Sequence, residues 1–266
     1  MRIIAGPWVG ELGWEVMKWQ GYVRKAVLEH LDETDEIIIG CRTGHDILYH
    51  DDRYAGKLRF RHFEPFPAPT CCELCGDRTY NEMMEAGTGD LRLPARRIMD
   101  AWDAEAKDFP KGTPIEPFES QEFVRLPKAA PNGLTVIHAR SWTKMASEWR
   151  NVALAGWERL VDHLDGDCVS VGIPGQAYHI SGTEDGMGMP LDETARLMSG
   201  ADLIIGSDSG PMHVAALTET PRMVIAPPRE HVRFSDKWLP FKGDQVTVVS
   251  TIDEALDHLK LTIATV

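Results

Sequence analysis

Residues 201–225 constrain the fold most, because they read as a strand, a loop, a helix and a second strand in direct succession. Leu203–Ile205 is a short apolar run between turn residues, which is typical of a strand buried on both faces. A glycine- and serine-rich loop follows at 206–210, and Pro211 stands where the first turn of a helix accepts proline. The first N–H groups of a helix have no partner within the helix, so this unit predicts a seat for a phosphate. A plain strand–helix–strand unit with a polar turn is the alternative.

The second half of the chain repeats this alternation, which predicts a doubly wound parallel sheet of the α/β class. The expected strands are 134–139, 168–172, 203–205, 222–226 and 245–249, and the expected helices are 155–163, 191–199, 212–217 and 252–259. The first half opens with a strand at 2–5, a glycine-rich loop, a helix over 14–30 and a strand at 36–39. The segment 41–128 reads as irregular, with helical patches at 80–85 and 95–108. Prolines near its end place a domain boundary that gives domains 1–130 and 131–266, with the last helix able to pack back on the first domain.

Charge and cysteine content exclude several classes of protein. The chain of 266 residues carries 41 acidic and 28 basic side chains, so its net charge is −13. This balance disfavours a protein whose whole surface follows nucleic acid. No apolar run is long enough to span a bilayer. Five cysteines in no regular framework predict a reduced, cytoplasmic protein.

The run DSGPMH at 208–213, with alanines at 215–216 and Thr-Pro at 220–221, resembles the signature of the heptosyltransferase-like family of B-type glycosyltransferases. The resemblance extends over about 134–228. It implies two Rossmann-like domains that face each other across a cleft, a nucleotide-sugar donor as co-substrate in the second domain, and no required cofactor. By resemblance, Asp208 accepts hydrogen bonds from the donor sugar and His213 lies beside the phosphates. Backbone groups would surround the diphosphate at Ser209, Gly210, Pro211 and Met212.

Further donor contacts follow from the same resemblance. The family places basic residues after the strand 134–139, which makes Arg140, Lys144 and Arg150 candidate phosphate partners; a solvated basic loop is the alternative. A threonine and an acidic residue hold phosphate and ribose in relatives, and Thr183 and Asp192 are the candidates here. Asp192 is equally suited to the start of a helix.

Inverting transfer from a nucleotide sugar needs a base that deprotonates the acceptor hydroxyl. The family puts a glycine–acid pair in the first strand–helix loop, where this chain has Gly10 and Glu11. Glu15 follows one helical turn later. We expect the catalytic base to be Glu11 or Glu15, and the alternative role for either is to complement the helix dipole.

Two features of the first half allow other sites. Cysteines at 71, 72 and 75 resemble half of a zinc knuckle, so His62, Cys72 and Cys75 could hold zinc; a structural zinc site needs four ligands, and reduced thiols are favoured instead. The stretch 53–63 contains basic and aromatic residues and no acid. We expect Arg59 and Arg61 to contact an anionic acceptor, with a solvated face as the alternative.

Together these observations predict a metal-independent glycosyltransferase that moves a hexosyl, heptosyl or pentosyl group from a nucleotide-diphosphate sugar to an acceptor hydroxyl. The resemblance implies a bacterial surface glycan as acceptor. One alternative is a phage-type DNA glycosyltransferase that acts on hydroxymethylated bases. The other is a nucleotide-sugar-binding module without catalysis.

Overall fold

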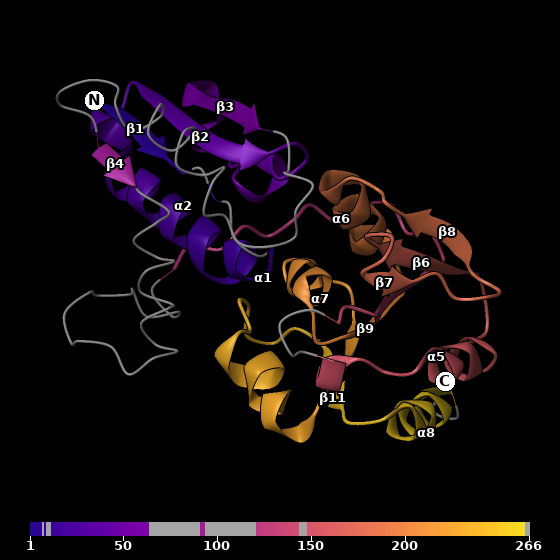
Figure 1. The fold of residues 1–266 in the computed structure, drawn as a ribbon. Coiled ribbons are helices and arrows are strands. Elements are labelled where there is room, and N and C mark those ends of the chain that lie inside the picture. The colour runs from indigo at the N-terminus through magenta and orange to yellow at the C-terminus, as the bar shows by residue number, and fades with distance from the viewer. Residues whose placement is uncertain (7, 9–11, 64–90, 94–120, 144–147, 264–266) are drawn as a thin grey trace. The chain divides into compact units, whose positions relative to one another are not determined.

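The structure is a computed structural model that describes residues 1–6, 8, 12–63, 91–93, 121–143 and 148–263 (Figure 1). The chain divides into two compact units, Met1–Val124 and Arg125–Val266. The boundary predicted at residue 130 lies within 121–134, a stretch with neither helix nor strand. The two units are described separately below.

The first unit is built on a parallel sheet of four strands in the order β3-β2-β1-β4. Their bounds are β1 Arg2–Ala5, β2 Glu36–Arg42, β3 Leu58–Phe63 and β4 Leu91–Leu93. The predicted first helix is confirmed as α1 (Leu12–Trp14), a π-helix (Glu15–Trp19) and α2 (Gln20–Glu29) in succession. Val16, Trp19, Val23 and Val27 are all fully buried, which is the helical stripe that the sequence shows.

Strand β3 corrects the expectation that 41–128 is irregular. Leu58 is buried while Arg59, Arg61 and His62 are exposed, and the strand pairs with β2 along its whole length. A charged edge strand of this kind protects a sheet from pairing with other chains. The predicted helical patches at 80–85 and 95–108 lie outside the described residues.

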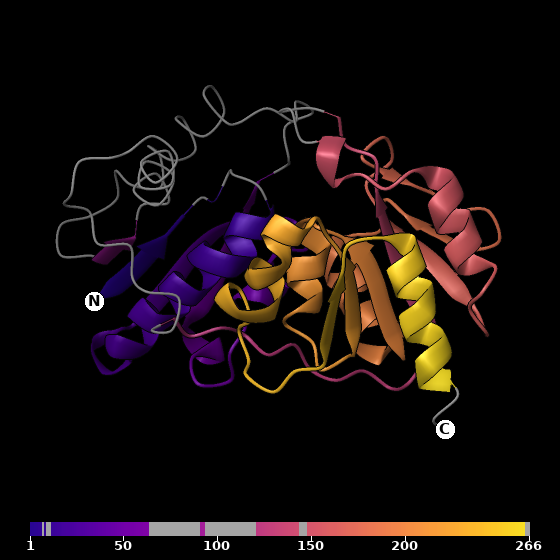
Figure 2. The same cartoon turned by 90° about the horizontal axis from the view of Figure 1, so that it is seen from below.

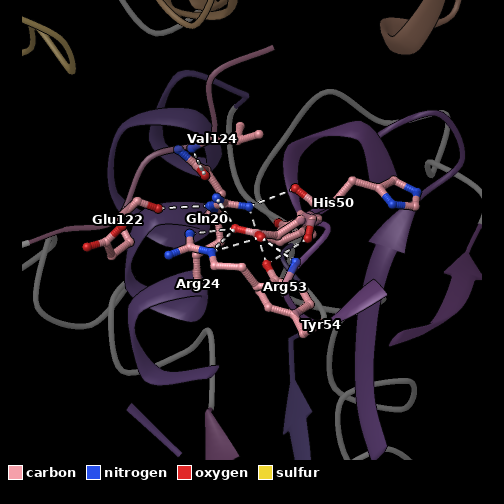
Figure 3. A network of polar contacts seen from close by, with 9 residues as sticks. Gln20, Arg24, His50, Arg53, Tyr54, Glu122 and Val124 are labelled. Atoms are coloured by element: carbon pink, nitrogen blue, oxygen red, sulfur yellow. Dashed lines mark hydrogen bonds and ion pairs between the residues drawn. The ribbon is translucent and has the colours of Figure 1, made fainter. Parts of the chain in front are cut away.

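Arg24 of α2 joins three separate parts of the first unit (Figure 3). Its guanidinium donates to the carbonyls of Glu122 and His50, at 2.9 and 2.8 Å, and to the carboxylate of Asp51 at 2.8 Å. The exposed Arg53 pairs with the same carboxylate and helps to hold the pKa of Asp51 at about 2. This network fixes the loop after β2 against α2, and that loop positions residues considered below.

The second unit is a doubly wound α/β sheet, as predicted. Its strands lie in the order β11-β10-β9-β5-β6-β8, and every neighbouring pair on this path is parallel. The bounds are β5 Thr135–Arg140, β6 Cys168–Gly172, β8 Glu184–Met187, β9 Leu203–Ser207, β10 Arg222–Ile225 and β11 Val246–Val249. A short strand, β7 (Ala177–Tyr178), pairs antiparallel with β5. The sequence did not predict β7 or β8, which are short and contain residues that rarely favour strands.

Helices cover both faces of this sheet. Figure 1 shows α6 (Leu191–Gly200) and α7 (Gly210–Ala215) on one face, with α5 (Leu154–Val161) and α8 (Ile252–Ile263) on the other. The second face encloses a core around Trp157, Ile137 and Ile225, and α8 packs on α5, β10 and β11 of its own unit (Figure 2). The order of the strands reverses between β5 and β9, since β6 and β8 follow on one side of β5 and β9, β10 and β11 on the other, and open α/β sheets bind ligands at such a reversal point.

Candidate functional site

The carboxyl ends of β5 and β9 meet at this reversal point. Strand β5 ends at Arg140 and β9 ends at Ser207, and the Arg140 N–H donates to Ser207 Oγ over 3.3 Å. The DSGPMH run therefore begins at the edge of the sheet where a ligand is expected. This is the position that the sequence predicts for the donor.

Two backbone N–H groups of the DSGPMH run are hydrogen-bonded to carbonyl groups of the protein. The N–H of Asp208 donates to Ile225 O at 3.3 Å, and the N–H of Met212 donates to Ser209 O at 3.2 Å. The Met212 side chain is buried so close to Gly206 that a Cβ there would lie 2.4 Å from its sulfur, so a larger residue at 206 would displace the Met212 side chain. Helix α7 is also short, and contacts of a diphosphate with the backbone at 209–212 stay a prediction.

Two arginines lie beside the Asp208 carboxylate. The Asp208 carboxylate is fully buried, and Arg150 Nη1 and Arg233 Nη1 each lie 3.7 Å from its Oδ1. Arg150 ends a 3₁₀ helix (Glu148–Arg150), and Arg233 begins a π-helix (Arg233–Lys237) after β10. Burial raises the pKa of Asp208 above its ordinary value, and the two arginines offset only part of this effect.

His213 lies in the same region with a neutral ring. Its imidazole stacks on Phe234 with 5.0 Å between centroids and an interplanar angle of 4°, and Trp238 lies 4.9 Å away at 57°. Burial, together with Arg233 and Arg150, lowers the pKa of His213 well below its ordinary value. The ring therefore offers a neutral donor or acceptor at physiological pH.

We call Arg150, Asp208, His213 and Arg233 the Asp208 cluster. Five of its buried polar atoms have no hydrogen-bond partner among the described residues: both carboxylate oxygens of Asp208, Nδ1 of His213, and Nε of each arginine. Buried polar groups are nearly always paired, and leaving one unpaired costs about 1–3 kcal/mol. Five such atoms thus gather at the edge where open α/β sheets bind ligands.

Three other predicted donor residues, Arg140, Thr183 and Asp192, have hydrogen-bond or ion-pair partners within the protein. Arg140 is buried, and its guanidinium donates to Trp142 O at 3.0 Å and to Asn151 Oδ1, so it holds the loop after β5. Thr183 Oγ1 bonds Ser170 Oγ at 2.7 Å and Ile180 O at 2.8 Å. Asp192 pairs with Arg196 one turn along α6. Lys144 lies outside the described residues, and the donor roles of these residues stay predictions.

Sequence reasoning missed Arg233, Phe234 and Trp238. The signal that could have found them is the one that selected Arg140, since basic and aromatic residues also follow the carboxyl end of β10. Nearby, the Arg229 guanidinium lies 3.5 Å from the ring centroid of Trp149, which is 44% exposed. This stack of a cation on an aromatic ring joins the residue before Arg150 to the residue four positions before Arg233.

In the first unit, Glu15 lies in a different environment. It is fully buried, yet Tyr49 Oη donates to Oε1 at 2.9 Å, His45 Nδ1 lies 2.7 Å from Oε2, and Arg42 lies at 3.8 Å. Burial raises the pKa of Glu15, but these partners outweigh it and hold the pKa below its ordinary value. We call Glu15, Arg42, His45 and Tyr49 the Glu15 cluster. Glu11 lies outside the described residues.

The remaining candidates are the acceptor-binding and zinc-binding residues predicted in the first half of the chain. Arg59 and Arg61 are exposed, and His62 stacks on Phe60 at 5.9 Å and lies 3.9 Å from Asp46. Cys72 and Cys75 lie outside the described residues. Within the described residues, no group of three or more histidine, cysteine, aspartate or glutamate side chains could hold a metal ion. No described helix has the length and apolar character needed to cross a bilayer.

Comparisons with known proteins support the resemblance to heptosyltransferases. Residues 188–262 match the family described as glycosyltransferase family 9 (heptosyltransferase). No curated protein sequence matches the chain.

Several solved structures are similar. The glycosyltransferase family 9 protein of Veillonella parvula is 13% identical, with 98% of this chain and 89% of that chain covered and a TM-score of 0.57. The Escherichia coli heptosyltransferase WaaC with ADP is 12% identical, with coverages of 100% and 99% and a TM-score of 0.56. For the iron-containing heptosyltransferase TibC of enterotoxigenic E. coli, the identity is 18% and the TM-score 0.49; 85% of this chain matches 58% of the length of TibC.

The predicted resemblance and the α/β class with parallel sheets are therefore confirmed, and the cleft between two domains stays a prediction. The family match includes the whole DSGPMH run and the segment that carries Arg233. Residues 188–262 have the sequence pattern of the heptosyltransferase family, and the chain has the fold of its B-type glycosyltransferases.

Proposed function

We propose that this protein is a glycosyltransferase that binds a nucleotide-diphosphate sugar at the Asp208 cluster and transfers the sugar with inversion to an acceptor hydroxyl. The observation that carries the proposal is the set of five unpaired buried polar atoms beside two arginines at the reversal point of the second sheet. The family match over 188–262 supports the reaction class.

Each member of the cluster has a role in this proposal. Arg150 and Arg233 bind the diphosphate and stabilise the charge that develops on it as the leaving group departs. The carboxylate of Asp208 accepts hydrogen bonds from sugar hydroxyls, which satisfy two oxygens that accept none from the described residues. His213, held between Phe234 and Trp238, contributes Nδ1 to the same ligand.

The donor to test first is an ADP-linked sugar, since one similar structure is WaaC with ADP and another is WaaC with ADP-2-deoxy-2-fluoro heptose. The acceptor that fits the resemblance is a bacterial surface glycan. The exposed Arg59 and Arg61 on β3 suit an acceptor that carries phosphate.

Thermal unfolding with a panel of nucleotide sugars and free nucleotides tests the donor. A ligand at a hundred times its dissociation constant should stabilise the protein by about 2.7 kcal/mol. The Asp208→Ala variant should lose the preference for a nucleotide sugar over the free nucleotide, because only the sugar contacts that carboxylate. If no nucleotide or nucleotide sugar stabilises the wild type, the proposal fails.

Release of free nucleoside diphosphate separates an enzyme from a binding module. The enzyme should release it slowly from the bound donor and faster when the correct acceptor is present. A pure binding module would release none.

A further inference from the structure

The two ring nitrogens of His45 differ in their contacts within the described residues. Nδ1 faces the Glu15 carboxylate at 2.7 Å, while Nε2 takes part in no hydrogen bond within the described part of the chain. The side chain keeps 11% of its surface exposed, although Glu15 behind it keeps none. His45 therefore keeps a small exposed surface, whereas the carboxylate that orients it is fully buried.

The backbone fixes this ring at the edge where ligands bind. Strand β2 ends at Arg42, and Gly44 turns the chain with a φ of +81°, which residues other than glycine rarely adopt. The His45 N–H donates to Arg42 O at 3.0 Å, and the His45 carbonyl accepts from Leu48 N–H at 3.0 Å. Because β2 lies beside β1, His45 follows the carboxyl end of the strand that neighbours the glycine-rich loop.

Glu15 itself is badly placed to receive a proton from a substrate. It is fully buried, one oxygen accepts from Tyr49, and the other faces His45 and Arg42. A carboxylate behind an imidazole fixes the ring and stabilises the imidazolium that forms when the ring takes a proton. We propose that His45 is the general base that deprotonates the acceptor hydroxyl and that Glu15 is its positioning residue, an inference that rests on the glycosyltransferase function proposed above.

The step balances without any further reactant. The acceptor O–H proton moves to His45 Nε2 as the acceptor oxygen forms a bond to the anomeric carbon of the donor. The bond from that carbon to the diphosphate oxygen breaks, and the electron pair leaves with the nucleoside diphosphate. His45 then releases its proton to solvent.

Charged groups near the ring come from the π-helix that carries Glu15 and from the end of β2. Glu15 and Asp46 are carboxylates, and Arg42 is the cation beside Glu15. Burial and the charge of Glu15 raise the pKa of Tyr49 well above its ordinary value, and burial raises that of the Cys41 thiol, so both stay neutral. Asp46 also lies 3.9 Å from His62 of β3. The Glu15 carboxylate, 2.7 Å from Nδ1, is the charged group in direct contact with the ring.

The first test is His45→Asn, whose amide reproduces the N–H that faces Glu15 and removes Nε2. We expect kcat to fall by about 10²- to 10⁴-fold while donor affinity is retained. The matched control is His50→Asn, the same change at an exposed histidine of the same loop, which should leave kcat within about twofold. Free imidazole should restore part of the activity of His45→Ala, which a purely structural role would not allow.

The second test is the pH profile. In the wild type the acid limb of kcat/KM reports protonation of the base, and this limb should vanish in His45→Asn. In Glu15→Gln the limb should move to lower pH, because the neutral amide no longer stabilises the imidazolium. A loss of activity that is uniform across pH in both variants would overturn the proposal and leave the cluster a structural role.

Donor binding measured on the same samples separates this inference from the proposed function. A wild type that binds no nucleotide sugar overturns both. Retained donor binding with wild-type turnover in His45→Asn overturns only the role of His45. Loss of turnover in Glu11→Gln alone would identify Glu11 as the base instead.

Discussion

The two units each bury a carboxylate near the carboxyl edge of a parallel sheet, and the two carboxylates are treated in opposite ways. Glu15 has hydrogen-bonded partners on both oxygens and a lowered pKa. Asp208 has two arginines at 3.7 Å, a raised pKa, and oxygens that accept no hydrogen bond from any residue that the structure describes. A buried polar network whose atoms are all hydrogen-bonded fixes the positions of its side chains. A network with unpaired atoms at the ligand-binding edge of a sheet is stabilised when a ligand pairs with them.

The largest expected effect tests whether the Asp208 cluster acts on the donor. Arg233→Met keeps the stem of the side chain and removes the guanidinium. We expect kcat/KM for the donor to fall by about 10²- to 10³-fold, since a cation aimed at the leaving group is lost. Arg229→Met, an exposed neighbour that stacks on Trp149, is the matched control and should change kcat/KM only slightly. Equal effects in the two variants would contradict the assignment of Arg233.

The next prediction compares the carboxylates through stability. At about pH 7, Glu15→Gln should lower the free energy of unfolding by roughly 3 kcal/mol, because it breaks a buried ionic network. The lowered pKa of Glu15 means that this contribution is present above pH 4.5 and is lost as pH falls through the folded-state value. The difference between variant and wild type should therefore shrink in acid.

Asp208→Asn should behave in the opposite way. The raised pKa means that the folded state holds its proton longer than the unfolded chain, so ionised Asp208 lowers stability as pH rises above 3.8. The variant should be as stable as the wild type at neutral pH, or more stable. Urea unfolding of both variants at acid and neutral pH measures these signs. A strongly destabilised Asp208→Asn would mean that its cluster is as complete as that of Glu15.

The sequence predicts the second unit far better than the first. Alternating apolar runs and helical stripes locate β5, β6, β9, β10 and β11, and the DSGPMH run locates Asp208 and His213. The sequence could not predict that Arg150 and Arg233 converge on one carboxylate, because residues 83 positions apart meet only through the strand order. Pairing of Glu15 with His45 depends likewise on β2 lying beside β1.

A smaller effect is expected at β3. Arg59→Gln and Arg61→Gln should raise the KM for a phosphorylated acceptor several-fold and leave donor affinity unchanged, because both side chains are exposed. If the acceptor is duplex DNA, each lost phosphate contact should reduce the log–log salt slope by about one unit. If the KM for the acceptor changes neither with salt concentration nor with the substitutions, β3 is an ordinary charged edge strand with no role in acceptor binding.

The smallest expected effect concerns metal ions. In the proposed function, Arg150 and Arg233 neutralise the diphosphate charge, so a chelator should leave the transfer rate within about twofold. Activity that is lost with chelator and returns with one added divalent ion would show that the arginines are not sufficient.

A structure of the protein with a bound nucleoside diphosphate tests the central claim most directly. We predict phosphate oxygens within about 3 Å of the Arg150 and Arg233 guanidinium groups, with Nδ1 of His213 also bonded to the ligand. The Asp208 carboxylate should remain open toward the position of the sugar. Phosphates bound elsewhere, with the five buried polar atoms still unpaired, would contradict the account.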